Sequence, residues 1–155
     1  MTTLTKEQLK AVHTGRTTNW KELGGIDAPI VLITVISGTG RGLVTELQDN
    51  IMDGSPYRED RIKVERQLDA VAALIPKSYG IIALSPAFPQ AGLKALAIDG
   101  FAPEPQHVQS GAYSLSRPLL LVLQAHPPGQ VKQFIDFMLG PEGQEIVTRN
   151  FVPVR

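Results

Sequence analysis

The stretch that decides the fold is IVLITVISGTGRG, residues 30–42. Residues 30–36 are apolar at nearly every position and rich in β-branched side chains, which is typical of a strand covered on both faces. The glycine-rich residues 37–42 are interpreted as a turn, and residues 43–52 are expected to form the helix that follows. A buried strand that leads through glycines into a helix predicts an α/β domain.

The residues before this strand predict a short capped helix and a loop. Thr5 is a candidate N-cap, and Gln8 three positions later completes a capping box. Leu4 and Leu9 are placed to pack together around the cap, and Gly15 is expected to end the helix. Residues 17–29 are predicted to be a loop that contains Trp20, which we interpret as a core anchor.

The residues after the strand predict an alternation of helices and strands. A second helix is expected across residues 61–74, with Ile62, Leu68, Val71 and Ala72 buried. Further strands are expected at residues 79–84, 93–98 and 119–123, an extended stretch at 101–109, and helices at 129–139 and 141–148. The helix at 129–139 is expected to turn its apolar side inward. This alternation predicts one α/β domain with a mainly parallel or mixed central sheet flanked by helices.

The composition excludes several functional classes. The 155 residues fit a single domain, and 15 basic against 15 acidic side chains give a formal net charge of zero. Because nucleic-acid binding needs clustered excess cations, nucleic acid is not expected as a partner. The chain has no cysteine, and no apolar run reaches the length of a membrane span. The polar N-terminus starts a helix and is not interpreted as a signal peptide.

The candidate binding site is the loop Ser37, Gly38, Thr39, Gly40 and Arg41. Backbone N–H groups at a helix N-terminus attract anions, and glycines allow a ligand to approach the backbone closely. The two hydroxyl groups can donate hydrogen bonds, and the arginine offers a charged, two-pronged donor. The alternative is an ordinary capped strand-to-helix turn with a solvated arginine.

Other sites find little support in the sequence. A dinucleotide-binding fingerprint needs a small residue at Leu43 and a second strand that ends in an acidic residue, whereas a helix-loop-helix is predicted here. A P-loop needs Lys and Ser or Thr after the last glycine. No cofactor, metal site or catalytic constellation is therefore expected, and the protein is not predicted to be an enzyme. The three histidines, of which none has metal-ligand spacing, are interpreted as surface or capping residues: His13, His107 and His126.

Several motifs together resemble PstS-type phosphate-binding proteins, the substrate-binding components of ABC transporters. The similar segments are LTKEQLK (residues 4–10), TGRTTNWKELGG (14–25), SGT (37–39), YGI (79–81), GAYSLSRPL (111–119) and FIDFMLGPEGQ (134–144). They cover nearly the whole chain, in the family's order.

The resemblance implies a three-layer lobe of a type II periplasmic-binding-protein fold, in which Ser37, Gly38 and Thr39 contact phosphate. It also implies an extracytoplasmic location and the membrane component of an ABC transporter as a partner. Family members carry an earlier segment that builds much of a first lobe, and we expect this chain to lack it. Residues 119–155 correspond to the segment that returns to that lobe. The arginine and the acidic residue that precede Ser-Gly-Thr in the family are replaced by residues 34–36.

Two functional hypotheses follow. The first is a non-enzymatic protein that binds a small oxyanion, phosphate or sulfate, weakly at Ser37–Arg41. The alternative is an interaction or sensory module that keeps the fold and binds a protein partner. Because the apolar residues after Arg117 need to be covered, a homodimer is also considered.

Overall fold

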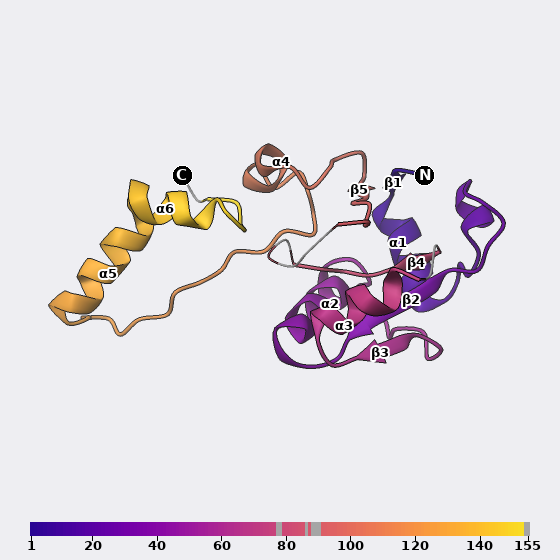
Figure 1. Cartoon of the computed structure of the whole chain (residues 1–155), viewed down its shortest axis with the longest axis horizontal. Coiled ribbons are helices and arrows are strands. Elements are labelled where there is room, and N and C mark those ends of the chain that lie inside the picture. The colour runs from indigo at the N-terminus through magenta and orange to yellow at the C-terminus, as the bar shows by residue number, and fades with distance from the viewer. Residues whose placement is uncertain (77–78, 86, 88–90, 154–155) are drawn as a thin grey trace.

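The structure is a computed structural model that describes residues 1–76, 79–85, 87 and 91–153. Its centre is a three-stranded parallel sheet in the order β3-β2-β4, formed by Ile62–Val64, Val31–Val35 and Gly80–Ile81. A two-stranded parallel sheet joins β1 (Thr3–Leu4) to β5 (Ala97–Ile98). The predicted α/β class is confirmed, and the predicted strand at residues 30–36 is the central strand β2 (Figure 1).

Helices cover both faces of the central sheet because β2 is apolar on both sides. Successive strand residues point to opposite faces. Leu32 packs in a cluster with α1 (Lys6–Thr14) and α2 (Gly38–Asn50). Ile33 and Val35 instead pack with Ala70 of α3 (Gln67–Leu74). The result is the predicted arrangement of three layers, with α1 and α2 on one face and α3 on the other.

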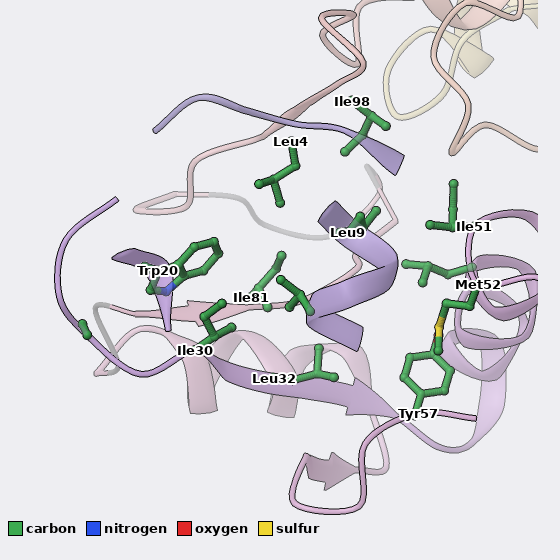
Figure 2. Close-up of a cluster of buried hydrophobic side chains, with 13 residues drawn as sticks. Leu4, Leu9, Trp20, Ile30, Leu32, Ile51, Met52, Tyr57, Ile81 and Ile98 are labelled. Atoms are coloured by element: carbon green, nitrogen blue, oxygen red, sulfur yellow. The ribbon is translucent and has the colours of Figure 1, made fainter. Parts of the chain in front are cut away.

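The larger core lies between α1, α2 and the sheet (Figure 2). Leu4 and Leu9 are both buried in it, as the predicted contact around the helix cap requires. Trp20 is 8% exposed and donates its indole N–H to the carbonyl of Tyr79 at 2.8 Å, so its interpretation as a core anchor is confirmed. It starts the 3-10 helix η1 (Trp20–Leu23), which interrupts the loop predicted at residues 17–29.

The first helix has the predicted boundaries. The Thr5 hydroxyl accepts from the backbone N–H of Gln8 at 3.1 Å, and the Gln8 side chain accepts from the N–H of Thr5 at 2.9 Å. Gly15 ends α1 with φ +83°, a conformation that glycine adopts without steric cost. Asp99, which follows β5, accepts a further hydrogen bond from the N–H of Lys6 at 3.1 Å. Groups of the chain itself therefore accept hydrogen bonds from the N–H groups of Lys6 and Gln8 at the α1 N-terminus.

Two boundaries around the central strand differ from the prediction. The predicted turn at residues 37–42 is already the first part of α2, which begins at Gly38. The first half of the helix predicted at 61–74 is strand β3, which pairs in parallel with β2 from Ile62 opposite Ile33 to Val64 opposite Val35. Three residues are too few for an alternating pattern to be recognised in the sequence, and here pairing with β2 outweighs local helix propensity. Only α3, the second half, is helical.

Some predicted burials are wrong. Leu68 is 52% exposed and Ala72 is exposed, because α3 turns Ala70 and Val71 towards the sheet instead. His13 is not a surface residue: it is 3% exposed, with its ring edge against Tyr57 at 5.7 Å between centroids. The exposed position of His126 agrees with the prediction.

The last two helices and the chain that leads to them lie apart from the body (Figure 1). Residues 119–123, predicted as a strand, form no described secondary structure and are 44–91% exposed. A strand needs a hydrogen-bonding neighbour, and no described strand runs beside them. The extended stretch predicted at 101–109 contains helix α4 (Pro105–Gln109).

The two last helices are confirmed as α5 (Gly129–Leu139) and α6 (Pro141–Val147), with Pro141 in the first turn of α6. These helices pack mainly against each other. The apolar side of α5 is not turned inward as predicted: Phe134 is 54% exposed and Val131 37%. A hydrogen bond of 3.1 Å from the Gln109 side chain to the carbonyl of Pro153 links the C-terminal segment back to α4.

Candidate functional site

The connection from β2 to α2 is held in place by the end of β3. The backbone N–H of Ile36 donates to the carbonyl of Val64 at 2.8 Å. The hydroxyl of Ser37 donates to the carbonyl of Glu65 at 2.7 Å. Two consecutive residues are therefore bound to two consecutive carbonyls, which fixes the position of the helix start relative to the sheet.

The N-terminus of α2 differs from that of α1. Ser37 is the N-cap residue, with extended φ and ψ of −137° and 173°, but its side chain makes no capping hydrogen bond. Gly38 has φ +57°, a left-handed conformation that favours glycine. The first four N–H groups of a helix have no partner within the helix, and here no side chain of the N-cap satisfies them. The backbone N–H groups of the first turn of α2 therefore receive no capping hydrogen bond from Ser37.

The structure brings the predicted residues together only in part. Ser37 and Gly38 stand at the helix start, and Arg41 lies in the first turn with its side chain exposed. The side chain of Thr39 and the exposure of Gly40 lie outside what the structure describes. Because the hydroxyl proton of Ser37 is directed to Glu65, Ser37 offers an anion its backbone N–H in this conformation.

The sequence prediction missed Arg117 as a candidate site residue. Its guanidinium group lies against α2 at Gly42, and its Nε atom is 3.2 Å from a carboxylate oxygen of Glu46. Arg117 belongs to the GAYSLSRPL segment, one of the motifs that resemble the family, but the motif by itself does not indicate a role for the arginine. Its proximity to α2 depends on a contact between segments far apart in the sequence.

A large cavity lies beside α2 but not at the helix start. This cavity of about 1000 Å³ opens along the side of α2 and is lined there by Leu43, Glu46 and Leu47. Of the loop residues whose side chains the structure describes, Ser37, Gly38 and Arg41 lie outside its lining, whereas Arg117 is part of it. The backbone donors that Ser37 does not cap lie at the helix start, whereas the cavity is lined mainly by apolar residues.

Other sites are not supported by the described residues. They contain no group of three or more histidine or acidic side chains that could hold a metal ion. None of the helices they form is both long and apolar enough to cross a membrane.

Comparison with known proteins identifies the family. A family model for the PBP superfamily domain matches residues 1–142. The chain belongs to the PBP superfamily. Within this superfamily it is related to the phosphate-binding proteins PstS of Borreliella burgdorferi and Bacillus subtilis, each 30% identical over 95% and 97% of the chain. The chain spans about half the length of these curated relatives, 56% and 50%.

Solved structures of this superfamily show the same fold. A Clostridium perfringens protein, assigned as a phosphate ABC transporter substrate-binding protein and solved with bound phosphate, superimposes with a TM-score of 0.84 at 30% identity. The match covers the whole chain and 64% of that protein. PstS from Borrelia burgdorferi gives a TM-score of 0.73 at 27% identity, over 97% of the chain and 62% of that protein. The resemblance found in the sequence motifs is therefore confirmed.

The fold removes one of the two arguments against a dinucleotide-binding site. The sequence predicted helix-loop-helix after β2, but the structure has α2 followed by strand β3, with Glu65 directly after it. The absence of a second strand is thus not a valid argument. Leu43 at the position of the required small residue still argues against this site, and the PBP superfamily match assigns the chain to a different family.

Proposed function

We propose that this PBP-superfamily chain is a non-enzymatic oxyanion-binding protein that takes up phosphate, or sulfate, weakly at the N-terminus of α2. The observation that carries the proposal is the likeness over the whole chain to a protein solved with bound phosphate. The uncapped helix start at Ser37 and Gly38 supplies the donors that such a ligand needs. By the same relationship, we propose an extracytoplasmic location and an ABC transporter membrane component as the partner.

Weak binding follows from what surrounds the helix start. The residues before Ser37 are Thr34, Val35 and Ile36, which provide no charged partner for an anion. Gly38 is exposed and Ser37 only half-buried. An anion held on one side of an open surface keeps part of its hydration, and the hydrogen bonds that it makes there are weaker than in a closed, dry site.

Isothermal titration of the 155-residue chain with phosphate and with sulfate tests this function. We expect heat of binding with at least one anion at millimolar concentration. Replacing Ser37 and Thr39 together by alanine is expected to weaken binding about tenfold. The Ser37 substitution releases the helix start from the carbonyl of Glu65, and the Thr39 substitution removes a hydroxyl donor from the first turn. Ser110→Ala, an exposed serine in another part of the chain, is the matched control and should bind like wild type. No heat with either anion, or an unchanged double variant, would contradict the proposal.

The exposed apolar residues favour a second role for the C-terminal segment. Val122 is 91% exposed, Leu120 77% and Phe134 54%, and large apolar side chains gathered in one segment of the chain and exposed to this degree indicate an interaction site. We propose that a second copy of the chain covers this surface. The alternative function, an interaction or sensory module, would place a different protein there.

Sedimentation equilibrium of the chain distinguishes these two cases. We expect a dimer at micromolar concentration. Replacing Leu120 and Val122 together by serine should shift the equilibrium to monomer without changing phosphate binding, because both residues lie outside α2. Ile26→Ser, a 59% exposed isoleucine on the body, serves as the control and should leave the dimer intact. A wild-type chain that remains monomeric at high concentration would contradict the dimer.

A further inference from the structure

Arg117 occupies a defined position on the surface of α2. A methyl group at Gly42 would lie 2.7 Å from its Nη1 atom and 3.2 Å from Nη2. The side chain of Glu46 holds the other end of the guanidinium group, with Nε and Oε2 3.2 Å apart. Both side chains are partly exposed, 38% for Arg117 and 32% for Glu46. The guanidinium therefore lies along the helix between these two positions.

The guanidinium group lies on the same face of α2 as Gly38, the first residue of the helix. Gly38, Gly42 and Glu46 are spaced four residues apart, so they lie on one face of the helix. The guanidinium at Gly42 is then about one helical turn, roughly 5.4 Å, from Gly38. Gly42 does not have a positive φ, so glycine is not needed there for its backbone conformation. Its role is to leave space for the guanidinium group.

The ends of the guanidinium group are available for a ligand. Nε is the nitrogen paired with Glu46, which leaves Nη1 and Nη2 beside Gly42, where there is no side chain to pair with them. Two parallel N–H donors of arginine match two oxygens of a tetrahedral oxyanion, and charge-assisted bonds of this kind are the strong ones. The chain has no charged residue directly before Ser37 to fill this role.

We infer that Arg117 is the cationic contact of the oxyanion site, and that Glu46 is its resting partner in the absence of the anion. This inference rests on the proposed function. Rotation about the outer torsions of Arg117 carries the guanidinium from Glu46 towards the first turn of α2, where the free N–H groups point. The anion and Glu46 then compete for the same guanidinium, so Glu46 sets how tightly phosphate is bound.

Titration of variants with inorganic phosphate tests the inference. Arg117→Gln is expected to raise the dissociation constant at least about tenfold, the effect of losing a hydrogen bond to a charged group. Glu46→Gln is expected to lower it a few-fold, because a neutral side chain competes less with phosphate for the guanidinium. Gly42→Ala is expected to raise it, because the methyl group displaces the guanidinium from the helix, while the free energy of unfolding stays equal or increases.

A merely structural Glu46–Arg117 pair would not produce these opposite signs. Arg16→Gln removes an arginine that is similarly paired with Glu7, at 2.6 Å on α1, and should leave phosphate affinity unchanged. In ¹H–¹⁵N spectra, the Nε–H resonance of Arg117, assigned by its loss in Arg117→Gln, should shift on addition of phosphate.

The phosphate affinities of wild type and the variants distinguish a failure of the role of Arg117 from a failure of the proposed function. If wild type binds phosphate and the Ser37/Thr39 double variant loses it, but Arg117→Gln keeps wild-type affinity, the role of Arg117 is overturned and the function stands. If Glu46→Gln binds phosphate as tightly as wild type or more weakly, Glu46 does not compete with the anion for Arg117. If the wild-type chain binds neither phosphate nor sulfate, function and inference fail together.

Discussion

Replacing Ile33 by alanine is expected to lower the free energy of unfolding by about 3 kcal/mol, within the range for truncating a buried isoleucine. Ile33 is 1% exposed at the centre of β2 and packs with Val35 and Ala70 between the sheet and α3. Few other residues on that side are fully buried, so there is little to move into the cavity. Since domains of this size are stable by only about 5–15 kcal/mol, the loss is large.

Urea unfolding followed by Trp20 fluorescence measures this effect, because the indole is buried in the other core and reports global unfolding. Ile26→Ala is the matched control: Ile26 is 59% exposed, and its truncation should change stability by less than about 0.5 kcal/mol. A loss of less than about 1 kcal/mol in Ile33→Ala would show that the α3 layer is not packed as described.

The elements predicted correctly are those whose signals are local. The β-branched run of β2 indicates a strand covered on both faces without reference to other parts of the chain. The Thr5–Gln8 capping box and Gly15 set both ends of α1 through contacts within a few residues. The same holds for α5 and α6, where the periodicity and Pro141 mark the boundaries.

The elements predicted wrongly depend on distant contacts. Strand β3 has only three residues, too short for a period to be distinguished from a helix, and it exists because β2 lies beside it. The residues at 119–123 have the apolar pattern of a strand, but a pattern does not supply the neighbour that a strand requires. Their exposure shows that an apolar pattern indicates residues that need to be buried, but does not indicate which surface buries them.

The candidate site shows the same division between local signals, which were predicted, and distant contacts, which were not. The position of Ser37 and Gly38 after a buried strand follows from local sequence, and the structure places both at the start of α2. The role proposed for Arg117 could not be assigned from its own segment, because it depends on the space that Gly42 leaves on a distant helix. The partner of the Ser37 hydroxyl, the carbonyl of Glu65, likewise follows a strand that was not predicted.

Acidification is expected to destabilise the fold through His13. Burial lowers the pKa of His13 from 6.5 to about 4, although a hydrogen bond to the Leu9 carbonyl partly opposes this. A carbonyl only accepts, so Nδ1, 2.8 Å from the Leu9 oxygen, carries the proton of the neutral ring. Protonation would place an uncompensated charge in the core beside Tyr57.

The direction of the effect follows from proton uptake. Above pH 6.5 the ring is neutral in both the folded and the unfolded chain, so this group adds no pH dependence. Between pH 6.5 and about 4 the unfolded chain binds a proton that the folded chain does not, and stability falls as the pH is lowered. A pKa difference of this size corresponds to a loss of about 3 kcal/mol, complete near pH 4.

Urea unfolding at a series of pH values measures this loss. His13→Gln removes the titrating group and should flatten the stability profile between pH 6.5 and 4, even though the variant is less stable at neutral pH. His126→Gln, which replaces an exposed histidine, should keep the wild-type profile. If the His13→Gln profile falls as steeply as that of wild type, the acid sensitivity arises from other groups and the ring is not held neutral by burial. If the fall in the free energy of unfolding disappears only in His13→Gln, the interface between α1 and the loop at Tyr57 is the acid-labile part of the core.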